Sequence, residues 1–513
     1  MTGGRDGFPQ LVRAEWTKLR TVRGWVAGLV AAALAIVLFG LLSATASHSS
    51  CSEGPVEVPC PTPPLGPGGV AVEDRFYFVS QELDGDGAIT ARVTSMSGQI
   101  RLPDVTPGVR NVVPGVVPWA KAGVMVKAGA EQGASYAAVM VTGDHGVRMQ
   151  HDFTEDVAGS PGGVSPAEPR WLRLTRAGDT LTGEESRDGK RWTGVGTAHL
   201  AGLPARVRIG LFAASPGDVT LVRNTLGGSA SASRFTEMTA VMDEVAVRGA
   251  TAGGDWRRDD VGVSLKLDGT PHHPGGLVRN GGTFTVTGTG DIAPDSHQGT
   301  VERTLAGALV ALIVVIVVAV LFVTAEYRRG LIRTTLLATP RRGRVLAAKA
   351  VVVGVATFVP ALVAAAVTLP IGRDVLSGNG IFTLPVGTLT ELRVIAGVAG
   401  LLAVAAVFAL ALGALFRRSA TALIVAIVAL VVPYVLATAS ILPDEAARWL
   451  LRLTPAAGFA IQQSVPAYEQ VISHYAPASG YFPLPPWGGF AVTCAYAALA
   501  LGLAVRRLNR EDV

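Results

Sequence analysis

Residues Ala325–Lys349, AEYRRGLIRTTLLATPRRGRVLAAK, form a short basic segment between two long apolar runs. The segment contains seven Lys/Arg and one acidic residue, Glu326. The runs are VERTLAGALVALIVVIVVAVLFVT before it, residues 301–324, and AVVVGVATFVPALVAAAVTLP after it, residues 350–370. A short basic segment between two membrane spans marks the cytoplasmic side. The pattern therefore predicts two transmembrane helices joined by a cytoplasmic loop.

The composition of the whole chain agrees with a membrane protein that carries a soluble part. Of its 513 residues, 49% are hydrophobic and only 16% are charged, and the mean hydropathy is +0.40. The formal net charge is +5, and the basic residues gather at the ends of the apolar runs. This placement indicates membrane orientation and argues against a basic nucleic-acid-binding protein.

Six apolar runs are long enough to cross a bilayer, so we predict an α-helical polytopic membrane protein. A rival interpretation of the first run, a cleaved signal peptide, is disfavoured because the run exceeds a typical signal core, and we expect an uncleaved anchor. The predicted order is a cytoplasmic helix at 1–24, span one at 25–45, an extracellular domain at 46–301, span two at 302–324, a cytoplasmic coupling loop at 325–349 and spans three to six within 350–513. The last region includes an outward, re-entrant segment at 441–487.

Charge counting supports this topology. The predicted cytoplasmic pieces hold 17 Lys/Arg and 5 Asp/Glu, whereas the two short outer loops, 371–393 and 441–487, hold only four arginines. Because cytoplasmic loops carry an excess of Lys and Arg, we expect both termini in the cytoplasm and a multi-pass protein of the cell membrane.

The segment before the first span, FPQLVRAEWTKLRTVR at 8–23, has apolar residues at helical spacing with basic residues around them. It predicts an interfacial amphipathic helix on the inner leaflet. An ordinary basic flank that only orients the first span is the alternative. The residues of this segment that we assign to the interface are Glu15, Trp16, Lys18 and Arg20.

Between spans one and two the pattern changes to short runs of alternating polarity. In RVRIGL, Val207, Ile209 and Leu211 point to one side and the two arginines to the other, which is typical of a half-buried strand. Asp188-Gly189 marks a hairpin turn. The order PWAKAGVMVKAG, SYAAVMVTGDHGVRMQ, PRWLRLTRAGDTLTGEESRDGKRWTGVG resembles laminin-G/concanavalin-like jelly rolls over about 72–249. We expect an all-β, jelly-roll-like domain there and a small β-rich region at about 254–300.

Cysteine usage is sparse, with three residues in the chain. Cys51 and Cys60 flank SEGPVEVP in the predicted extracellular part, where an oxidising environment favours a disulfide. Two free thiols are the alternative. Cys494 lies in the last span and is interpreted as a small buried apolar residue.

The apolar cores of the six spans contain no Asp, Glu, Lys, Arg or His. Ion-coupled transporters usually keep ionisable residues near the middle of the membrane, so the pattern argues against ion coupling and favours an apolar or amphipathic substrate. No phosphate-binding G-x-x-x-x-G-K-[ST] loop occurs. We therefore predict no catalytic, cofactor or metal site in this chain, and ATP bound by a partner subunit.

RAEWTKLRTVRGW before span one and the basic segment after span two resemble the permease subunits of actinobacterial ATP-binding-cassette exporters of the type-two class. The likeness covers about 8–45 and 300–513. It implies that two six-span units pair and that a separate ATPase docks on the cytoplasmic face. It also implies a coupling helix in the basic segment, with contacts at Glu326, Tyr327, Arg328, Arg329, Arg333, Thr334 and Thr335.

The inserted β region of roughly 250 residues departs from the plain family pattern. It leaves a second hypothesis open, in which the chain is a membrane-anchored protein that binds or senses cell-surface glycan or peptide.

Overall fold

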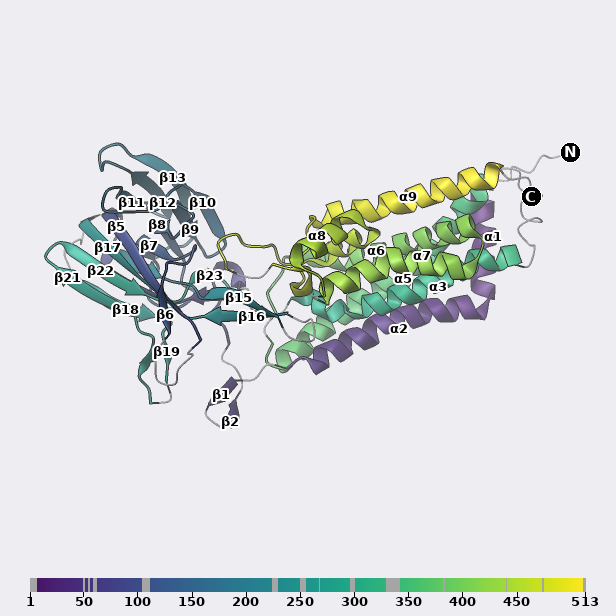
Figure 1. Cartoon of the computed structure of the whole chain (residues 1–513), viewed down its shortest axis with the longest axis horizontal. Helices are drawn as coiled ribbons and strands as arrows, with labels where there is room; N and C mark the ends of the chain where they lie inside the picture. The colour runs from purple at the N-terminus through teal and green to yellow at the C-terminus, as the bar shows by residue number, and fades with distance from the viewer. Residues whose placement is uncertain are drawn as a thin grey trace.

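The computed structural model describes residues 7–48, 51–53, 56–58, 62–103, 111–223, 229–249, 255–266, 268–295, 300–328, 342–381, 383–439, 441–472 and 475–510. A helical bundle lies at one end of the molecule and a β domain at the other (Figure 1). The start of α1 (Phe8–Thr21) and the end of α9 (Pro486–Arg510) lie at the end of the bundle that faces away from the β domain.

Six helices in the described chain are long and apolar enough to cross a membrane, which indicates a multi-pass membrane protein. They overlap all six predicted spans. Their bounds are α2 (Arg23–Ala46), α3 (Gly307–Arg328), α5 (Arg342–Gly378), α6 (Thr388–Phe416), α7 (Ser419–Thr438) and α9 (Pro486–Arg510).

Helix α5 is longer than the apolar run that predicted it. It begins at Arg342 instead of residue 350, and it continues through Pro360 and Pro370 to Gly378. Neither proline interrupts the helix, since backbone groups freed by proline in a bundle find other partners. The predicted loop at 325–349 is therefore helical at both ends, as α3 to Arg328 and as α5 from Arg342.

Shorter helices cap the two ends of the bundle. Helix α1 (Phe8–Thr21) lies across the end that faces away from the β domain (Figure 1). At the opposite end, α8 (Asp444–Leu453) has acidic residues in its first turn and a basic residue in its last, which suits the helix dipole. It is followed by the buried 3-10 segment η3 (Pro455–Gln462).

The β domain contains two large antiparallel sheets. The seven-stranded sheet has the order β10 (Glu155–Ala158), β9 (Val147–His151), β8 (Tyr136–Thr142), β7 (Lys121–Lys127), β14 (Arg206–Ala214), β4 (Phe76–Asp84), β18 (Arg257–Val261). The eight-stranded sheet has the order β13 (Thr193–His199), β12 (Thr180–Ser186), β11 (Arg170–Ala177), β5 (Gly87–Arg101), β17 (Thr236–Gly249), β22 (Thr283–Gly288), β21 (Gly276–Asn280), and β6 (Val112–Pro114) pairs with β5.

Small two-stranded pairs and 3-10 turns complete the domain. The pairs are β1 (Cys51–Glu53) with β2 (Val56–Val58), β3 (Val72–Asp74) with β23 (Ile292–Pro294), β15 (Asp218–Arg223) with β16 (Ser229–Arg234) and β19 (Ser264–Leu265) with β20 (Pro271–His272). The turns are η1 (Pro67–Gly69), η2 (Val301–Leu305) and η4 (Pro477–Ser479). Strands β18, β21 and β22 thus belong to the main sheets and β23 pairs with β3, so these strands are not a separate region.

The hydrophobic core explains the two burial patterns of the strands. Strand β11 alternates between buried and partly buried residues, whereas β7 and β8 are buried throughout. One face of β7 packs against the other sheet, and its opposite face packs under β3 and β23. Val207, Ile209 and Leu211 lie in the core between the sheets, as their alternation predicts.

Two local predictions have different outcomes. The turn at Asp188-Gly189 joins β12 to β13, and Gly189 has φ +69°, a conformation that favours glycine. Cys60 lies outside the described residues, so its disulfide with Cys51 stays a prediction. Cys494 is a free, partly buried thiol in α9.

Candidate functional site at the basic end of the bundle

Helix α1 presents an acidic residue to the bundle. Glu15 and Leu19 are buried on its inner side, whereas Phe8, Trp16 and Arg20 are exposed. Val22 is extended and turns the chain from α1 into α2. The predicted helix is therefore present, and Glu15 faces protein.

Four charged side chains from three helices meet on the inner side of α1. We call them the ion cluster: Glu15 and Lys18 of α1, Glu326 of α3 and Lys349 of α5. The ammonium of Lys349, in α5, donates to Glu15 Oε2 at 2.6 Å and to Glu326 Oε1, in α3, at 2.6 Å. Lys18 donates to Glu15 Oε1 at 2.8 Å and to Glu326 Oε1 at 3.2 Å. The cluster has two carboxylates and two ammonium groups, so its charges balance.

Three of the four side chains of the ion cluster are buried, so its contacts affect the stability of the fold. Lys349 is 1% exposed, Glu15 3% and Glu326 6%. The Lys349 ammonium also lies 5.0 Å from the centre of the Phe322 ring, where a cation–π attraction adds to the pairing. Removing one partner would leave a buried charge without compensation, which typically costs about 3–5 kcal/mol. The cluster thus holds α1, α3 and α5 in one arrangement.

Lys18 closes the cluster on its solvent side. Burial disfavours its ammonium form, but hydrogen bonds to Glu15 and Glu326 and the charges of both outweigh burial and raise the pKa of Lys18 above its usual 10.5. Because the pKa of Lys18 is raised in the folded state, its contacts with Glu15 and Glu326 stabilise the fold fully below pH 10.5. This stabilisation is lost as the pH rises through the pKa of Lys18 in the folded protein.

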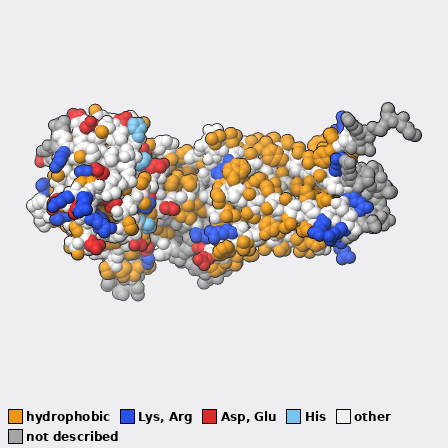
Figure 2. All heavy atoms as spheres, turned by 90° about the horizontal axis from the view of Figure 1, so that it is seen from above, with side chains coloured by type: hydrophobic (Ala, Val, Ile, Leu, Met, Phe, Trp, Pro, Cys, Tyr) orange, Lys and Arg blue, Asp and Glu red, His pale blue; other side chains and the backbone are white. Residues whose placement is uncertain are grey.

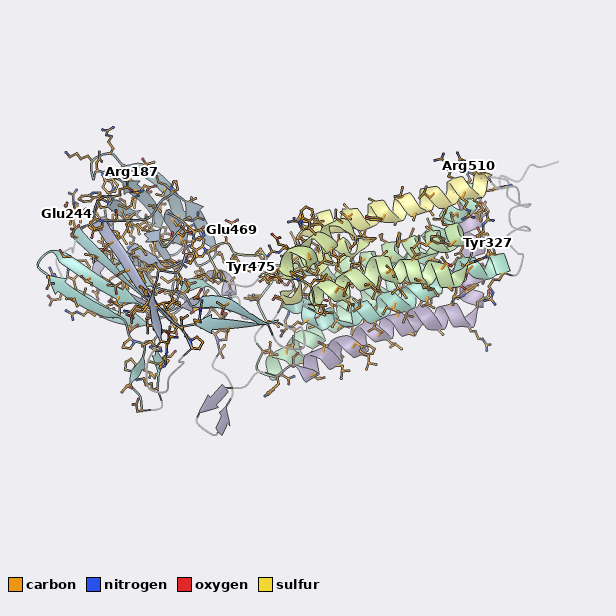
Figure 3. All side chains as sticks on the ribbon, viewed as in Figure 1. Arg187, Glu244, Tyr327, Glu469, Tyr475 and Arg510 are labelled. Carbon is orange, nitrogen blue, oxygen red and sulfur yellow. The ribbon has the colours of Figure 1, made fainter. Side chains whose placement is uncertain are left out.

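Arginines join neighbouring helix ends at the same end of the bundle. Arg342, at the start of α5, donates to the carbonyl of Leu508 in α9 at 2.8 Å. Arg507 donates to the carbonyl of Leu415 in α6 at 2.7 Å. Cations near helix C-termini also suit the helix dipole. Figures 2 and 3 show basic side chains gathered at this end, next to the apolar surface of the bundle, with Tyr327 and Arg510 there as well.

The structure brings together only some of the residues that the sequence singled out. Glu15, Lys18 and Glu326 meet in the ion cluster. Tyr327 is partly buried, with the guanidinium of Arg417 5.4 Å from its ring centre. Four of the predicted contacts lie outside the described residues and stay predictions: Arg329, Arg333, Thr334 and Thr335. Arg328, at the end of α3, is exposed, and so are Trp16 and Arg20.

Sequence reasoning missed Lys349 as a functional residue, although it ends the basic segment. It is the only lysine among the seven basic residues of 325–349. A long charged side chain at a span end normally extends to the interface. Here its partner Glu15 is 334 positions away in the sequence, so local pattern does not reveal the contact.

A second set of polar contacts lies at the opposite end of the bundle. Residues 463–472 and 475–482 run between the bundle and the β domain, and Glu469 and Tyr475 in Figure 3 mark their course. Gln470 donates to the carbonyls of Thr154 at 3.0 Å and Phe153 at 3.4 Å, in the turn between β9 and β10. Ile472 packs against the core between the sheets. This segment therefore links the helices to the β domain.

Comparisons with known proteins give no family assignment. No family model matches the chain, and no curated protein matches it. A functionally unknown protein from Saccharomyces cerevisiae is similar at 16% identity, over 34% of this chain and 76% of that one, with a TM-score of 0.19. Scytalido-glutamic peptidase with a transition-state analogue inhibitor is similar at 9% identity, over 42% and 98%, with a TM-score of 0.24. Scores this low carry no argument about fold or function.

Proposed function

We propose that the chain is the transmembrane subunit of an ATP-binding-cassette exporter, driven by a separate ATPase subunit. The ion cluster is the observation that carries the proposal. It joins α1 to α3, which ends within the basic segment 325–349, and to α5, which begins within it. A partner that moved this segment would act on three helices held together by buried charge. The substrate would be apolar or amphipathic, in keeping with spans whose apolar cores lack Asp, Glu, Lys, Arg and His.

The proposal includes a topology and a domain assignment. The basic end of the bundle would face the cytoplasm, with both termini, and the β domain would be extracellular and jelly-roll-like. Two copies of the chain would pair around the transport path. Basic residues at one end of the bundle support the orientation, and the two packed antiparallel sheets support the domain assignment.

Arg328 offers a test that spares the ion cluster, because its side chain is exposed at the end of α3. Tagged full-length chain would be purified in mild detergent, and co-purifying proteins would be identified and assayed for ATP hydrolysis. We expect an ATPase subunit with the wild type and much less with Arg328→Glu. Arg418→Glu is the matched control, because Arg418 is exposed beyond α6 at the same end. An absent ATPase, or equal loss in both variants, would refute this docking site.

A second candidate, a membrane-anchored glycan- or peptide-binding sensor, is favoured by the contact of residues 470–472 with the β domain. Gln470 and Ile472 would pass a change in the β domain to the helices. This candidate predicts that wild-type chain captures cell-wall fragments and co-purifies with no ATPase. The same purification therefore separates the two functions.

A further inference from the structure

A cavity of about 200 Å³ lies at the end of the bundle nearest the β domain. Four stretches distant in the sequence surround it: the entry to α3, the end of α7, η3 and the residues around η4. At about 30 Å³ per molecule, it has room for roughly seven waters, or for a small polar headgroup.

The polar lining of the cavity carries both signs of charge. Glu302 and Arg303 are consecutive residues of η2; Glu302 is partly buried and Arg303 is exposed. The carboxylate of Glu302 accepts from the hydroxyl of Ser464, from the backbone N–H of Ser464 at 3.4 Å and from the side chain of Thr300. These donors are neutral, so the carboxylate still attracts a cation. One turn of chain thus presents an acceptor for a cation and a donor for an anion.

Gln462 supplies an independent sign of a missing ligand. Its side chain lines the same cavity and is 6% exposed, and its amide Nε2 has no hydrogen-bond partner in the described protein. A buried donor without a partner costs about 1–3 kcal/mol. A phosphate or carboxylate oxygen in the cavity would satisfy this amide and would sit within the reach of an arginine on the same rim.

Apolar side chains also line the cavity, and they lead out along the helices. The rings of Tyr434 and Phe459 stack with their centres 3.8 Å apart, and Leu309 of α3 also lines the cavity. Ile313, one turn further along α3, is exposed at 37% on the same face. An apolar chain attached to a bound headgroup would follow this face of the bundle.

We infer that the cavity binds a zwitterionic amphiphile, whose ammonium pairs with Glu302 and whose anionic group contacts Gln462 and Arg303. Both a phospholipid with an amino headgroup and an amphiphile with an amino-acid headgroup have this chemistry. Binding at this cavity requires no ATPase partner, so it stands apart from the proposed transport.

The test uses the full-length chain, freed of lipid in detergent, with binding followed by native mass spectrometry. The probes are dihexanoyl phosphatidylethanolamine, dihexanoyl phosphatidylglycerol, which lacks the ammonium, and S-dodecylcysteine, which carries an ammonium and a carboxylate. We expect either zwitterion to bind at least about tenfold more tightly than phosphatidylglycerol. Whichever zwitterion binds more tightly identifies the source of the headgroup.

Variants locate the site. Glu302→Gln and Gln462→Leu are each expected to weaken zwitterion binding about tenfold. Glu391→Gln is the matched control, because Glu391 begins α6 at the same end but does not line the cavity. If Glu302→Gln fails to fold, Gln462→Leu still decides the matter. Equal affinity for the zwitterions and phosphatidylglycerol, or unchanged binding by folded Gln462→Leu protein, would overturn the inference.

Discussion

Replacing Lys349 with methionine is expected to destabilise the helical bundle by about 3 kcal/mol. The change removes two 2.6 Å hydrogen bonds and leaves the carboxylates of Glu15 and Glu326 buried. Losing one partner of a buried ion pair costs about 3–5 kcal/mol. The low end applies because Lys18 remains beside both carboxylates and because methionine keeps contact with the Phe322 ring, worth about 0.3–1.5 kcal/mol.

A loss of about 3 kcal/mol lowers the ratio of folded to unfolded chain by about 150-fold, since each 1.4 kcal/mol is a factor of ten. Denaturant-induced unfolding of the full-length chain in detergent would measure it, with tryptophan fluorescence as the signal. Arg373→Met is the matched control: it also lies in α5, but its 3.3 Å contact with Glu391 is partly solvent-exposed, with side-chain exposures of 35% and 28%. Such a pair is worth at most about 1 kcal/mol.

A compensating variant separates lost charge balance from lost packing. Lys349→Met combined with Glu15→Gln and Glu326→Gln removes the three buried charges together and leaves only Lys18, whose side chain is 40% exposed. Buried ion pairs replaced as a set are often neutral in stability. We expect this triple variant to regain most of the loss. The reasoning is refuted if Lys349→Met alone costs no more than Arg373→Met, or if the triple variant is less stable than the single one.

Three further changes test other parts of the fold. Gln470→Ala removes the hydrogen bonds to the turn between β9 and β10. The turn should lose about 1–2 kcal/mol of local stability, so amide hydrogen exchange should become faster there. Unchanged exchange would disprove the link. Lys127→Met leaves the buried carboxylate of Asp74 without its 2.7 Å partner. We expect the free energy of unfolding of the β domain to fall by about 3–5 kcal/mol, and that of the helical bundle to stay unchanged. Gly40→Ala places a Cβ 2.2 Å from a backbone oxygen at the entry to α3 and should lower the free energy of unfolding by about 1–3 kcal/mol. Gly24→Ala is the control, because a Cβ at this position of the same helix meets nothing within 4 Å. Thermal unfolding compares the two variants, and equal effects would contradict close packing.

The sequence predicted the six spans because a run of about 20 apolar residues has few stable alternatives. It also predicted the strands whose two faces differ, such as the one containing Val207 and Ile209. It did not reveal which strands are neighbours, because β18 pairs with β4 and β22 with β17 across long stretches of chain. That choice depends on packing that brings distant residues together, so 254–300 looked like a separate region.

The candidate site was predictable only to the level of its segment. Charge excess located the basic end of the bundle, and helical spacing identified α1. Neither signal distinguishes a charge that faces solvent from one that faces protein, and Glu15 and Lys349 face protein. Their pairing follows from how α1 crosses the ends of α3 and α5. The cavity near Glu302 was likewise invisible, because its lining comes from four separate stretches.

The helices that carry the β domain are restrained at three levels. At the basic end, the ion cluster fixes α3 to α5 and α1. Near the β domain, Gly40 of α2 lies against the backbone at the entry to α3, and Gly307 of α3 lies against the backbone of α2. Beyond them, β3 and β23 pair with each other, and buried lysines of β7 hold both by bonding Asp74 and Asp291. Because α2 and α3 are so closely joined along their length, we expect them to move as one unit with the β domain, and any large rearrangement of the bundle to occur between this unit and α7 or α9.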